Sequence, residues 1–301
     1  MGNALKGYCA RWIRTLKTVT IIGSKGQLGT DLVKTFTAAG WGVLPLEHSQ
    51  IEVENLDSVN KSLSRNKSDW IINTAAFHKV EECEKNSEKS WLINSIGPLN
   101  VAKVANALDS RTVFISSDFV FSGDLSKELS HDEDHSVSPI NTYGHSKAGG
   151  ELATLCTDQD NLVVRISSVF GCAGSSGKGG NFVESIIAKA KKNETLNVFD
   201  DIQMSPTYTM DAAQIIYAAL EANLTGIVHA SNLGSTTWFS FAKKIIELTN
   251  LNSDLNPIQT NSEIYPKRPL NSALGSKRFL GKRSDWQDGL QRYLVEKGHI
   301  K

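Results

Sequence analysis

The sequence has few cysteines and no excess of charge of either sign. Its 301 residues include four cysteines, Cys9, Cys83, Cys156 and Cys172, and 32 basic residues balance 32 acidic ones. The cysteines form no CxxC pair and no metal-like spacing, which favours free thiols in a reducing compartment. A net charge of zero gives no indication of nucleic acid or a membrane surface as a partner. We therefore expect a cytoplasmic protein with no metal site.

Long apolar runs are also missing, and no stretch reaches the length of a membrane span. Residues 1–17 carry basic side chains and no acidic one, but they lack the continuous apolar core and the small-residue cleavage site of a secretory signal. We interpret them as a basic N-terminal extension that precedes the fold. The remaining length suits one large domain or two closely joined ones.

From Thr18 onward, short apolar runs alternate with longer amphipathic ones. This alternation is typical of a parallel sheet covered by helices, so the sequence predicts an α/β fold with a doubly wound parallel sheet. The expected strands are residues 18–23, 41–46, 69–76, 111–118 and 161–171, followed by late strands at 196–201 and 226–232.

Three glycines, Gly23, Gly26 and Gly29, lie between the first expected strand and the first expected helix. Glycines at this spacing permit a tight turn and a close approach of the backbone to a pyrophosphate, while the helix N-terminus offers unpaired amide groups to the anion. The spacing is a weak signal alone, but its strand-loop-helix context is the one that a dinucleotide site requires. We expect the same loop to contact the cofactor through Lys25, Gln27 and Leu28 as well.

An acidic residue is expected about twenty positions further on, where it accepts hydrogen bonds from the ribose hydroxyl groups. Glu47 holds this position, and a solvated turn residue is its structural alternative. Its carboxylate favours NADH by repelling a 2′-phosphate, whereas His48 beside it could accommodate that phosphate, so NADPH or NADH stays open. Further candidates for the cofactor pocket are Ala75 and Ala76 at the end of the third strand, and Asn94 one helix later.

Tyr143 and Lys147 lie four residues apart at the start of an expected helix. Side chains at this spacing share a helix face, and an ammonium group one turn away lowers the pKa of a phenol. Such a pair can pass a proton to or from a substrate oxygen while a cofactor carries the hydride. Ser117, at the carboxyl end of the preceding strand, could orient the same oxygen. The structural alternative is a packed tyrosine beside a lysine that extends to solvent.

The ordered motifs of the chain resemble the dTDP-4-dehydrorhamnose reductase family of the extended short-chain dehydrogenases/reductases. They run from about Thr18 to about Arg268 and are GSKGQLG, NTAAFHKVEECE, SSDFVFSG, YGHSK followed by GGE, VVRISSVFG, GGNFVE and DDIQMSPT. The resemblance implies an NAD(P)H-dependent enzyme that reduces the 4-keto group of a nucleotide-linked deoxysugar. It implies an NAD(P)-binding Rossmann domain over residues 18–170, to which late strands around 195–232 return. Residues 171–194 and 233–301 would form a small C-terminal substrate-binding portion.

The resemblance also assigns roles to single residues. Tyr143 would be the proton donor, Lys147 would tune its pKa and contact the ribose, and Ser117 stands where the family usually has threonine. The residues expected at the substrate are Asp118, Phe119, Ser168, Asn181, Phe182, Gln203 and Pro206.

Two of these residues depart from the family pattern. Phe119 replaces the usual tyrosine, and Ser168 stands where rhamnose-forming members tend to have a tryptophan. The departures leave the identity of the sugar open, although the reduction chemistry is unaffected.

Other functions stay open beside the reductase. An epimerase of the same fold would carry the same tyrosine and lysine, but would turn over without added reductant. A regulatory subunit similar to the beta subunit of methionine adenosyltransferase would bind the nucleotide and serve a partner enzyme. A 4,6-dehydratase is disfavoured because Phe119 stands where those enzymes carry the second residue of an Asp-Glu pair. The expected partner is a nucleotide sugar, and a homodimer is left open.

Overall fold

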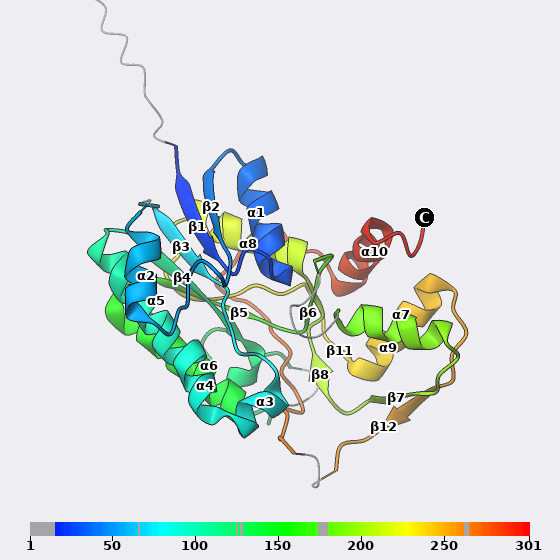
Figure 1. Cartoon of the computed structure of the whole chain (residues 1–301). Helices are drawn as coiled ribbons and strands as arrows, with labels where there is room; N and C mark the ends of the chain where they lie inside the picture. Colours follow the sequence, from blue (N-terminus) through cyan, green and yellow to red (C-terminus); the bar gives the residue numbers. More distant parts are fainter. Residues whose placement is uncertain (1–15, 66, 125, 127–128, 174–179, 262–264) are drawn as a thin grey trace, which may run out of the picture.

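The computed structural model of the chain describes residues 16–65, 67–124, 126, 129–173, 180–261 and 265–301 (Figure 1). The expected basic extension therefore lies outside the described residues, except for Leu16 and Lys17. Among the described residues, no helix combines the length and the apolar character that crossing a bilayer requires.

Six parallel strands form the central sheet, in the order β10-β5-β4-β3-β1-β2 (Figure 1). The order reverses between β1 and β3, and ligands of doubly wound sheets bind outside the carboxyl ends of the strands at such a point. The expected doubly wound α/β fold is confirmed. The strands are β1 (Thr18–Ile22), β2 (Gly42–Leu46), β3 (Trp70–Asn73), β4 (Arg111–Ser117), β5 (Leu162–Ile166) and β10 (Gly226–His229).

Helices cover both faces of this sheet. One face packs on α1 (Gln27–Ala38) and α8 (Thr209–Glu221), and the other on α2 (Leu56–Leu63), α5 (Gly97–Ala107) and α6 (Thr142–Thr157). The sequence did not lead us to predict α8, because its buried face includes the polar Thr209 and Asp211 while Tyr217 and Ala218 lie outside that face, and both features weaken the amphipathic period.

The helix expected to start at Ser87 is interrupted. It follows the short α3 (Val80–Lys85) and consists of α4 (Ser87–Trp91), a π-helical turn (Leu92–Ile96) and α5. A π-helical turn inside an α-helix frequently marks a functional site. Here it carries Asn94, one of the residues expected near the cofactor.

A second apolar core lies beside the sheet, under α7 (Phe182–Lys191), α9 (Trp238–Thr249) and α10 (Trp286–Glu296). Strand β7 (Leu196–Phe199) pairs with β12 (Leu255–Ile258) at this core, so β10 joins the central sheet and β7 does not. The boundaries of the cofactor and substrate portions stay a prediction. Two short ladders complete the fold, β6 (Val169–Phe170) with β9 (Thr207–Tyr208), and β8 (Gln203–Met204) with β11 (Thr236–Thr237).

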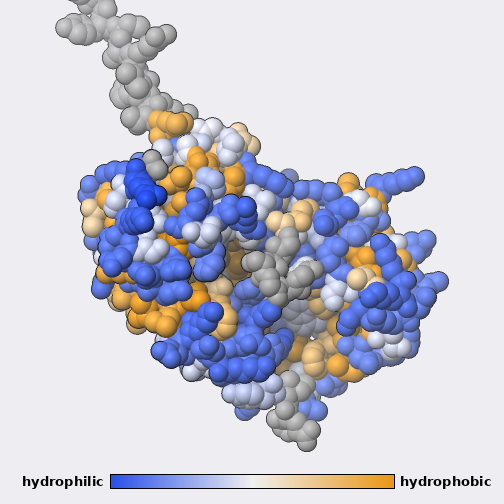
Figure 2. Space-filling view, in the orientation of Figure 1, coloured by the Kyte–Doolittle hydropathy of each residue, from blue (hydrophilic) through white to orange (hydrophobic). Residues whose placement is uncertain are grey.

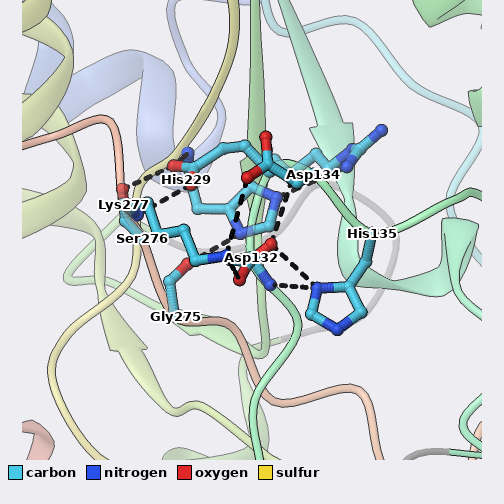
Figure 3. A network of polar contacts seen from close by, with 9 residues as sticks. Asp132, Asp134, His135, His229, Gly275, Ser276 and Lys277 are labelled. Atoms are coloured by element: carbon cyan, nitrogen blue, oxygen red, sulfur yellow. Dashed lines mark hydrogen bonds and ion pairs between the residues drawn. The ribbon is translucent and has the colours of Figure 1, made fainter.

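Polar contacts fasten the connection between β4 and α6 to the end of β10 (Figure 3). The carboxylate of Glu133 accepts hydrogen bonds from the backbone amides of His229 at 3.0 Å and Lys277 at 2.8 Å. The ring Nδ1 of His229 donates to the carbonyl oxygen of Gly275 at 2.8 Å, since a carbonyl can only accept. At the surface, Lys277 Nζ pairs with Asp132 at 2.6 Å.

Burial shapes the charges in this network. It lowers the pKa of His229, so the ring is neutral in the fold. Burial acts to raise the pKa of Glu133, but the hydrogen bonds from Ser276 and Lys277 outweigh it and lower this pKa overall. The network therefore holds a charged carboxylate beside a neutral imidazole.

Candidate active site

The glycine loop between β1 and α1 is shaped by close backbone contacts. Gly23 has a φ of +79°, and a Cβ there would lie 2.4 Å from Thr74 Oγ1. A Cβ on Gly29 would lie 2.2 Å from the carbonyl oxygen of Gly23. Gly26 is the N-cap of α1 and brings no side chain to cap the first turn, whose amide groups can therefore face an anion. This loop fits a pyrophosphate held by backbone groups.

Glu47 lies just after β2, beside the glycine loop. Its carboxylate forms an ion pair with Lys25 Nζ at 2.8 Å. Both side chains are substantially exposed, so the pair contributes little to stability. It does bring the expected ribose acceptor to the loop, and His48 next to it is exposed.

Two other residues of the loop direct their side chains elsewhere. Leu28 is buried against the central sheet. Gln27 Oε1 accepts hydrogen bonds from the backbone amide of Gly171 and from the side chain of Asn181. Contact of these two residues with a cofactor would therefore rest on their backbone amides.

Ser117 ends β4 and meets Tyr143 in the first turn of α6. Asn141 Oδ1 caps this helix by accepting a hydrogen bond from the amide of Gly144 at 2.8 Å. A Cβ on Gly144 would lie 2.1 Å from the carbonyl oxygen of Phe119, so a glycine lets α6 approach the backbone after β4. The Ser117 hydroxyl lies close enough to the Tyr143 phenol to act on its pKa, which the contact lowers against the effect of burial. Two hydroxyl groups thus converge at the carboxyl end of β4.

Burial acts in opposite directions on the tyrosine and the lysine. It raises the pKa of the Tyr143 phenol and lowers the pKa of the Lys147 ammonium to about 7. Lys147 Nζ donates to the carbonyl oxygen of Ile115 at 2.6 Å and lies 4.0 Å from the centre of the Phe114 ring. The expected lowering of the Tyr143 pKa by Lys147 is not found, because desolvation dominates and the ammonium group is directed at the strand.

Glu151, one turn beyond Lys147 on α6, extends this row of contacts with the sheet. Its carboxylate accepts a hydrogen bond from Ser116 at 2.6 Å and a bidentate pair from Arg165 at 2.8 and 2.7 Å. Glu151 is 4% exposed and Arg165 is 1% exposed. The negative charge acts to raise the pKa of Lys147 against the effect of burial. Tyr143, Lys147 and Glu151 therefore fix one face of α6 on β4 and β5.

Asp118, expected at the substrate, is buried behind Ser117. Burial raises its pKa, and three serine hydroxyl groups oppose that effect by donating to the carboxylate. These are Ser117 at 3.0 Å, Ser167 at 2.8 Å and Ser272 at 2.7 Å. The carboxylate thus ties together three distant segments of the chain. Neither Ser167 nor Ser272 was predicted from the sequence, and no local pattern marks them.

Phe119 lies beside Tyr143, and Ser168 follows Ser167, which contacts Asp118. The Phe119 ring packs edge-on against Tyr143, with 5.7 Å between the ring centroids. Ser168 has a φ of +45°, which is uncommon for a residue with a Cβ, and such conformations cluster at functional sites.

The remaining residues expected at the substrate lie around the second core. Phe182 packs on Trp238, with 4.6 Å between the ring centroids. Gln203 Nε2 donates to Ser235 Oγ at 2.9 Å, and Pro206 is buried. Figure 2 shows that the molecular face between this core and the part around the central sheet is hollowed.

Asn94 holds the loop after β3 against α6. Its side chain accepts a hydrogen bond from the amide of Phe77 at 2.8 Å and donates to the carbonyl oxygen of Phe77 at 2.8 Å. It also donates to Ser146 Oγ at 3.0 Å. Ala75 and Ala76 are partly exposed in this loop, next to the glycine loop. Asn94 thus joins the loop after β3 to α6, and its contact with a cofactor stays a prediction.

Comparisons with known proteins bear on this arrangement. Residues 17–298 match the family model described as the RmlD substrate binding domain. The chain is 34% identical to the spore coat polysaccharide biosynthesis protein SpsK of Bacillus subtilis, over 93% of this chain and 97% of that protein. It is 30% identical to a dTDP-4-dehydrorhamnose reductase of Mycolicibacterium smegmatis, over 91% of this chain and 84% of the relative. A crystal structure of a dTDP-4-dehydrorhamnose reductase from Bacillus anthracis in complex with NADP is 32% identical, with a TM-score of 0.86, and the match covers 93% and 99% of the two chains.

Proposed function

The chain belongs to the dTDP-4-dehydrorhamnose reductase family, and we propose that it is an NAD(P)H-dependent oxidoreductase that reduces the 4-keto group of a nucleotide-linked deoxysugar. The observation that carries the proposal is the meeting of the Ser117 and Tyr143 hydroxyl groups at the carboxyl end of β4. A proton donor is needed there, because reduction of a carbonyl group leaves a negative charge on its oxygen. Relatives named as reductases favour this function over an epimerase or a regulatory subunit.

The residues present fit a nicotinamide dinucleotide. Gly23, Gly26 and Gly29 would leave room for a pyrophosphate at the N-terminus of α1, and Glu47, which pairs with Lys25 beside this loop, would accept hydrogen bonds from the ribose. When bound, the nicotinamide supplies the hydride.

Tyr143 would deliver the proton from its phenol oxygen. Its raised pKa keeps the phenol protonated at any physiological pH, which is the state that a donor requires. An alkoxide is a stronger base than a phenolate, so donation toward the substrate oxygen is favourable. Ser117 would hold the substrate oxygen near the phenol.

Lys147 would contact the ribose of the cofactor, and its charge depends on pH. With a pKa of about 7, the Nζ group changes charge near neutral pH, and it lies one helical turn from Tyr143. A charged ammonium group has three donors, one of which serves Ile115, and the others would serve the ribose hydroxyl groups. We therefore propose the protonated form of Lys147 as the active one.

The substrate would be a nucleotide sugar, with its sugar between Phe119 and Ser168. Both residues are smaller or less polar than those usual in the family, so a deoxysugar other than dTDP-4-dehydrorhamnose also fits the proposal. We place the reaction in the cytoplasm, because the sequence favours reduced cysteines. A homodimer stays a prediction, and light scattering of the purified protein would test it.

The test is to mix purified protein with dTDP-4-dehydrorhamnose and to follow the absorbance of NADH and NADPH in separate assays. Oxidation that is lost in Tyr143→Phe would support the reductase and would show the preferred cofactor. Turnover of a nucleotide sugar without added reductant would favour an epimerase instead. Cofactor binding without turnover of any keto-sugar, together with a stable partner enzyme, would favour the regulatory subunit.

A further inference from the structure

Gln27, the first residue of α1, connects the glycine loop to residues that follow β6. Its Oε1 accepts a hydrogen bond from the backbone amide of Gly171 at 3.0 Å and another from Asn181 Nδ2 at 3.4 Å. A backbone amide can only donate, so the contact with Gly171 fixes which end of the Gln27 carboxamide is the oxygen. The Oε1 atom of Gln27 therefore faces the second core and not the glycine loop.

The orientation of Asn181 is fixed in the same way. Its Oδ1 accepts a hydrogen bond from the backbone amide of Glu184 at 3.1 Å and so caps α7. Its Nδ2 must then be the donor to the carbonyl oxygen of Gly171 at 3.1 Å and to the Tyr293 hydroxyl at 3.0 Å, and one of its two hydrogens is shared with Gln27 Oε1 at 3.4 Å. Gly171 is thus held through both its amide and its carbonyl group.

The contacts continue from Asn181 into the second core. The Tyr293 hydroxyl donates to Glu184 Oε1 at 2.6 Å, and the ring of His299 contacts the same oxygen at 2.9 Å. Tyr293 is buried in α10 and packs edge-on against Phe170, with 5.3 Å between the ring centroids. A side chain of the glycine loop is therefore joined, through Asn181, to the start of α7 and to α10.

We propose that Gln27 is a positioning residue that couples the cofactor site to the substrate side of the cleft. The turn of α1 that offers its amide groups to a pyrophosphate also carries the Gln27 acceptor. Ordering this turn by a bound cofactor orders the contact with Gly171 and Asn181, and with it the N-terminus of α7. The coupling is reciprocal, so a bound nucleotide sugar tightens cofactor binding in turn. This inference rests on the proposed function.

Two substitutions of Gln27 separate coupling from a simple cofactor contact. Gln27→Met keeps the length of the side chain and removes the acceptor, whereas Gln27→Glu keeps an acceptor oxygen and adds a negative charge near the pyrophosphate. At saturating cofactor, we expect the KM for the nucleotide sugar to rise roughly three- to tenfold in Gln27→Met. It should stay near the wild-type value in Gln27→Glu, although that variant binds cofactor more weakly. The exposed Gln291→Met on α10 is the matched control and should change neither constant.

The proposal is overturned if both Gln27 variants show the same change in cofactor affinity at saturating substrate and neither changes the KM for the nucleotide sugar. A second substitution keeps the test independent of local misfolding. Asn181→Asp retains the acceptor that caps α7 and loses the Nδ2 donor to Gln27, Gly171 and Tyr293. The double variant Gln27→Met, Asn181→Asp should raise KM by less than the two single effects combined, because both substitutions remove the contact between these two residues. Additive effects would show that the two residues act separately.

Amide hydrogen exchange tests the coupling without turnover. The Gly171 amide should exchange more slowly in the wild type than in Gln27→Met, and added NADP⁺ should slow it further only in the wild type. A wild type that reduces no keto-sugar would refute the proposed function, while the exchange result would still decide the coupling. Equal exchange of the Gly171 amide in wild type and Gln27→Met, with and without NADP⁺, would refute the coupling alone.

Discussion

Lys147 Nζ lies 2.6 Å from the carbonyl oxygen of Ile115. The hydrogen bond fixes the lysine of the proposed catalytic pair to the middle of the sheet, one turn behind Tyr143. An ammonium group in this dry position is easily deprotonated, and burial lowers its pKa to about 7. The charge of the site is therefore sensitive to pH in the range in which the enzyme would work.

Removal of the Tyr143 hydroxyl should abolish reduction without loss of the cofactor. Tyr143→Phe deletes a proton donor and no binding surface, so kcat should fall about 10²- to 10⁴-fold while the Kd for NADPH stays within about twofold. Stopped assays would give kcat, and quenching of NADPH fluorescence would give Kd. Ser117→Thr keeps a hydroxyl group and should retain most activity, in contrast to Ser117→Ala. Tyr143→Phe with most of its turnover intact would rule out this donor.

Turnover should decrease as the pH rises through the pKa of Lys147. The protonated form is the proposed active one, so kcat/KM for the nucleotide sugar should show a descending limb near pH 7. Lys147→Arg keeps the positive charge and cannot lose its proton in this range, so the limb should disappear even if the overall rate falls. An unchanged limb in Lys147→Arg would assign it to another group.

Loss of Glu151 should destabilise the fold strongly. Its partner Arg165 is 1% exposed and would be left with an unpaired buried charge. Removing one member of such a pair costs about 3–5 kcal/mol. Urea unfolding of Glu151→Ala should show this loss, and the double variant Glu151→Met, Arg165→Met should recover most of it. A single variant within about 1 kcal/mol of the wild type would contradict a dry ion pair.

The glycines of the glycine loop should not respond alike to substitution. A Cβ on Gly29 would meet the backbone of Gly23 at 2.2 Å, whereas the nearest contact of a Cβ on Gly26 is 3.2 Å. Gly29→Ala should therefore lower the melting temperature as well as cofactor affinity. Gly26→Val should crowd the pyrophosphate and weaken cofactor binding in a protein that still folds. Calorimetry and NADPH titration of both variants would separate the effects, and wild-type affinity in a folded Gly26→Val would count against the placement of the cofactor.

Acid should destabilise the protein through the network around His229. The pKa of this histidine is lowered in the fold, so the unfolded chain binds a proton that the native state does not bind as pH falls below about 6.5. Its stabilising contribution is complete above that pH and is lost progressively below it. The lowered pKa of Glu133 adds a second loss, below about pH 4.5. Thermal melts from pH 7 to 4 should show both losses, and His229→Asn should flatten the upper part of the curve. A melting temperature that is constant over this range would contradict a neutral buried ring.

The sequence predicted those parts of the structure that depend on residues close together in the chain. Alternating apolar runs predicted the strands on both sides of β4, and the spacing of the glycines located the loop before α1. The helix α8 was missed because polar residues on its buried face and apolar residues on its outer face weaken the amphipathic period. The role of Asp118 could not be read locally either, since its partners Ser167 and Ser272 are brought to it only by the fold.

For Tyr143 and Lys147, the sequence predicted where the side chains lie but not their pKa values. Their spacing on one helix face was predictable from the period of the helix. The depth of their burial was not, and burial determines the direction of both pKa shifts. The row of contacts from Tyr143 to Glu151 depends on how closely α6 approaches its neighbours, which Gly144 permits at the carbonyl oxygen of Phe119 and Gly150 permits at the carbonyl oxygen of Asn94.

The π-helical turn at Leu92–Ile96 restricts the number of residues that this part of the chain can have. A π-helical turn holds one residue more than regular α-helix, and each residue turns a helix by about 100°. Deleting one residue there would leave a regular α-helix. Asn94 would then be rotated out of its contacts with Phe77 and Ser146. Single-residue deletions between Ser87 and Gly97 should therefore be tolerated far less than substitutions on the exposed side of the same turn. In alignments of related chains, gaps would be expected to avoid this segment.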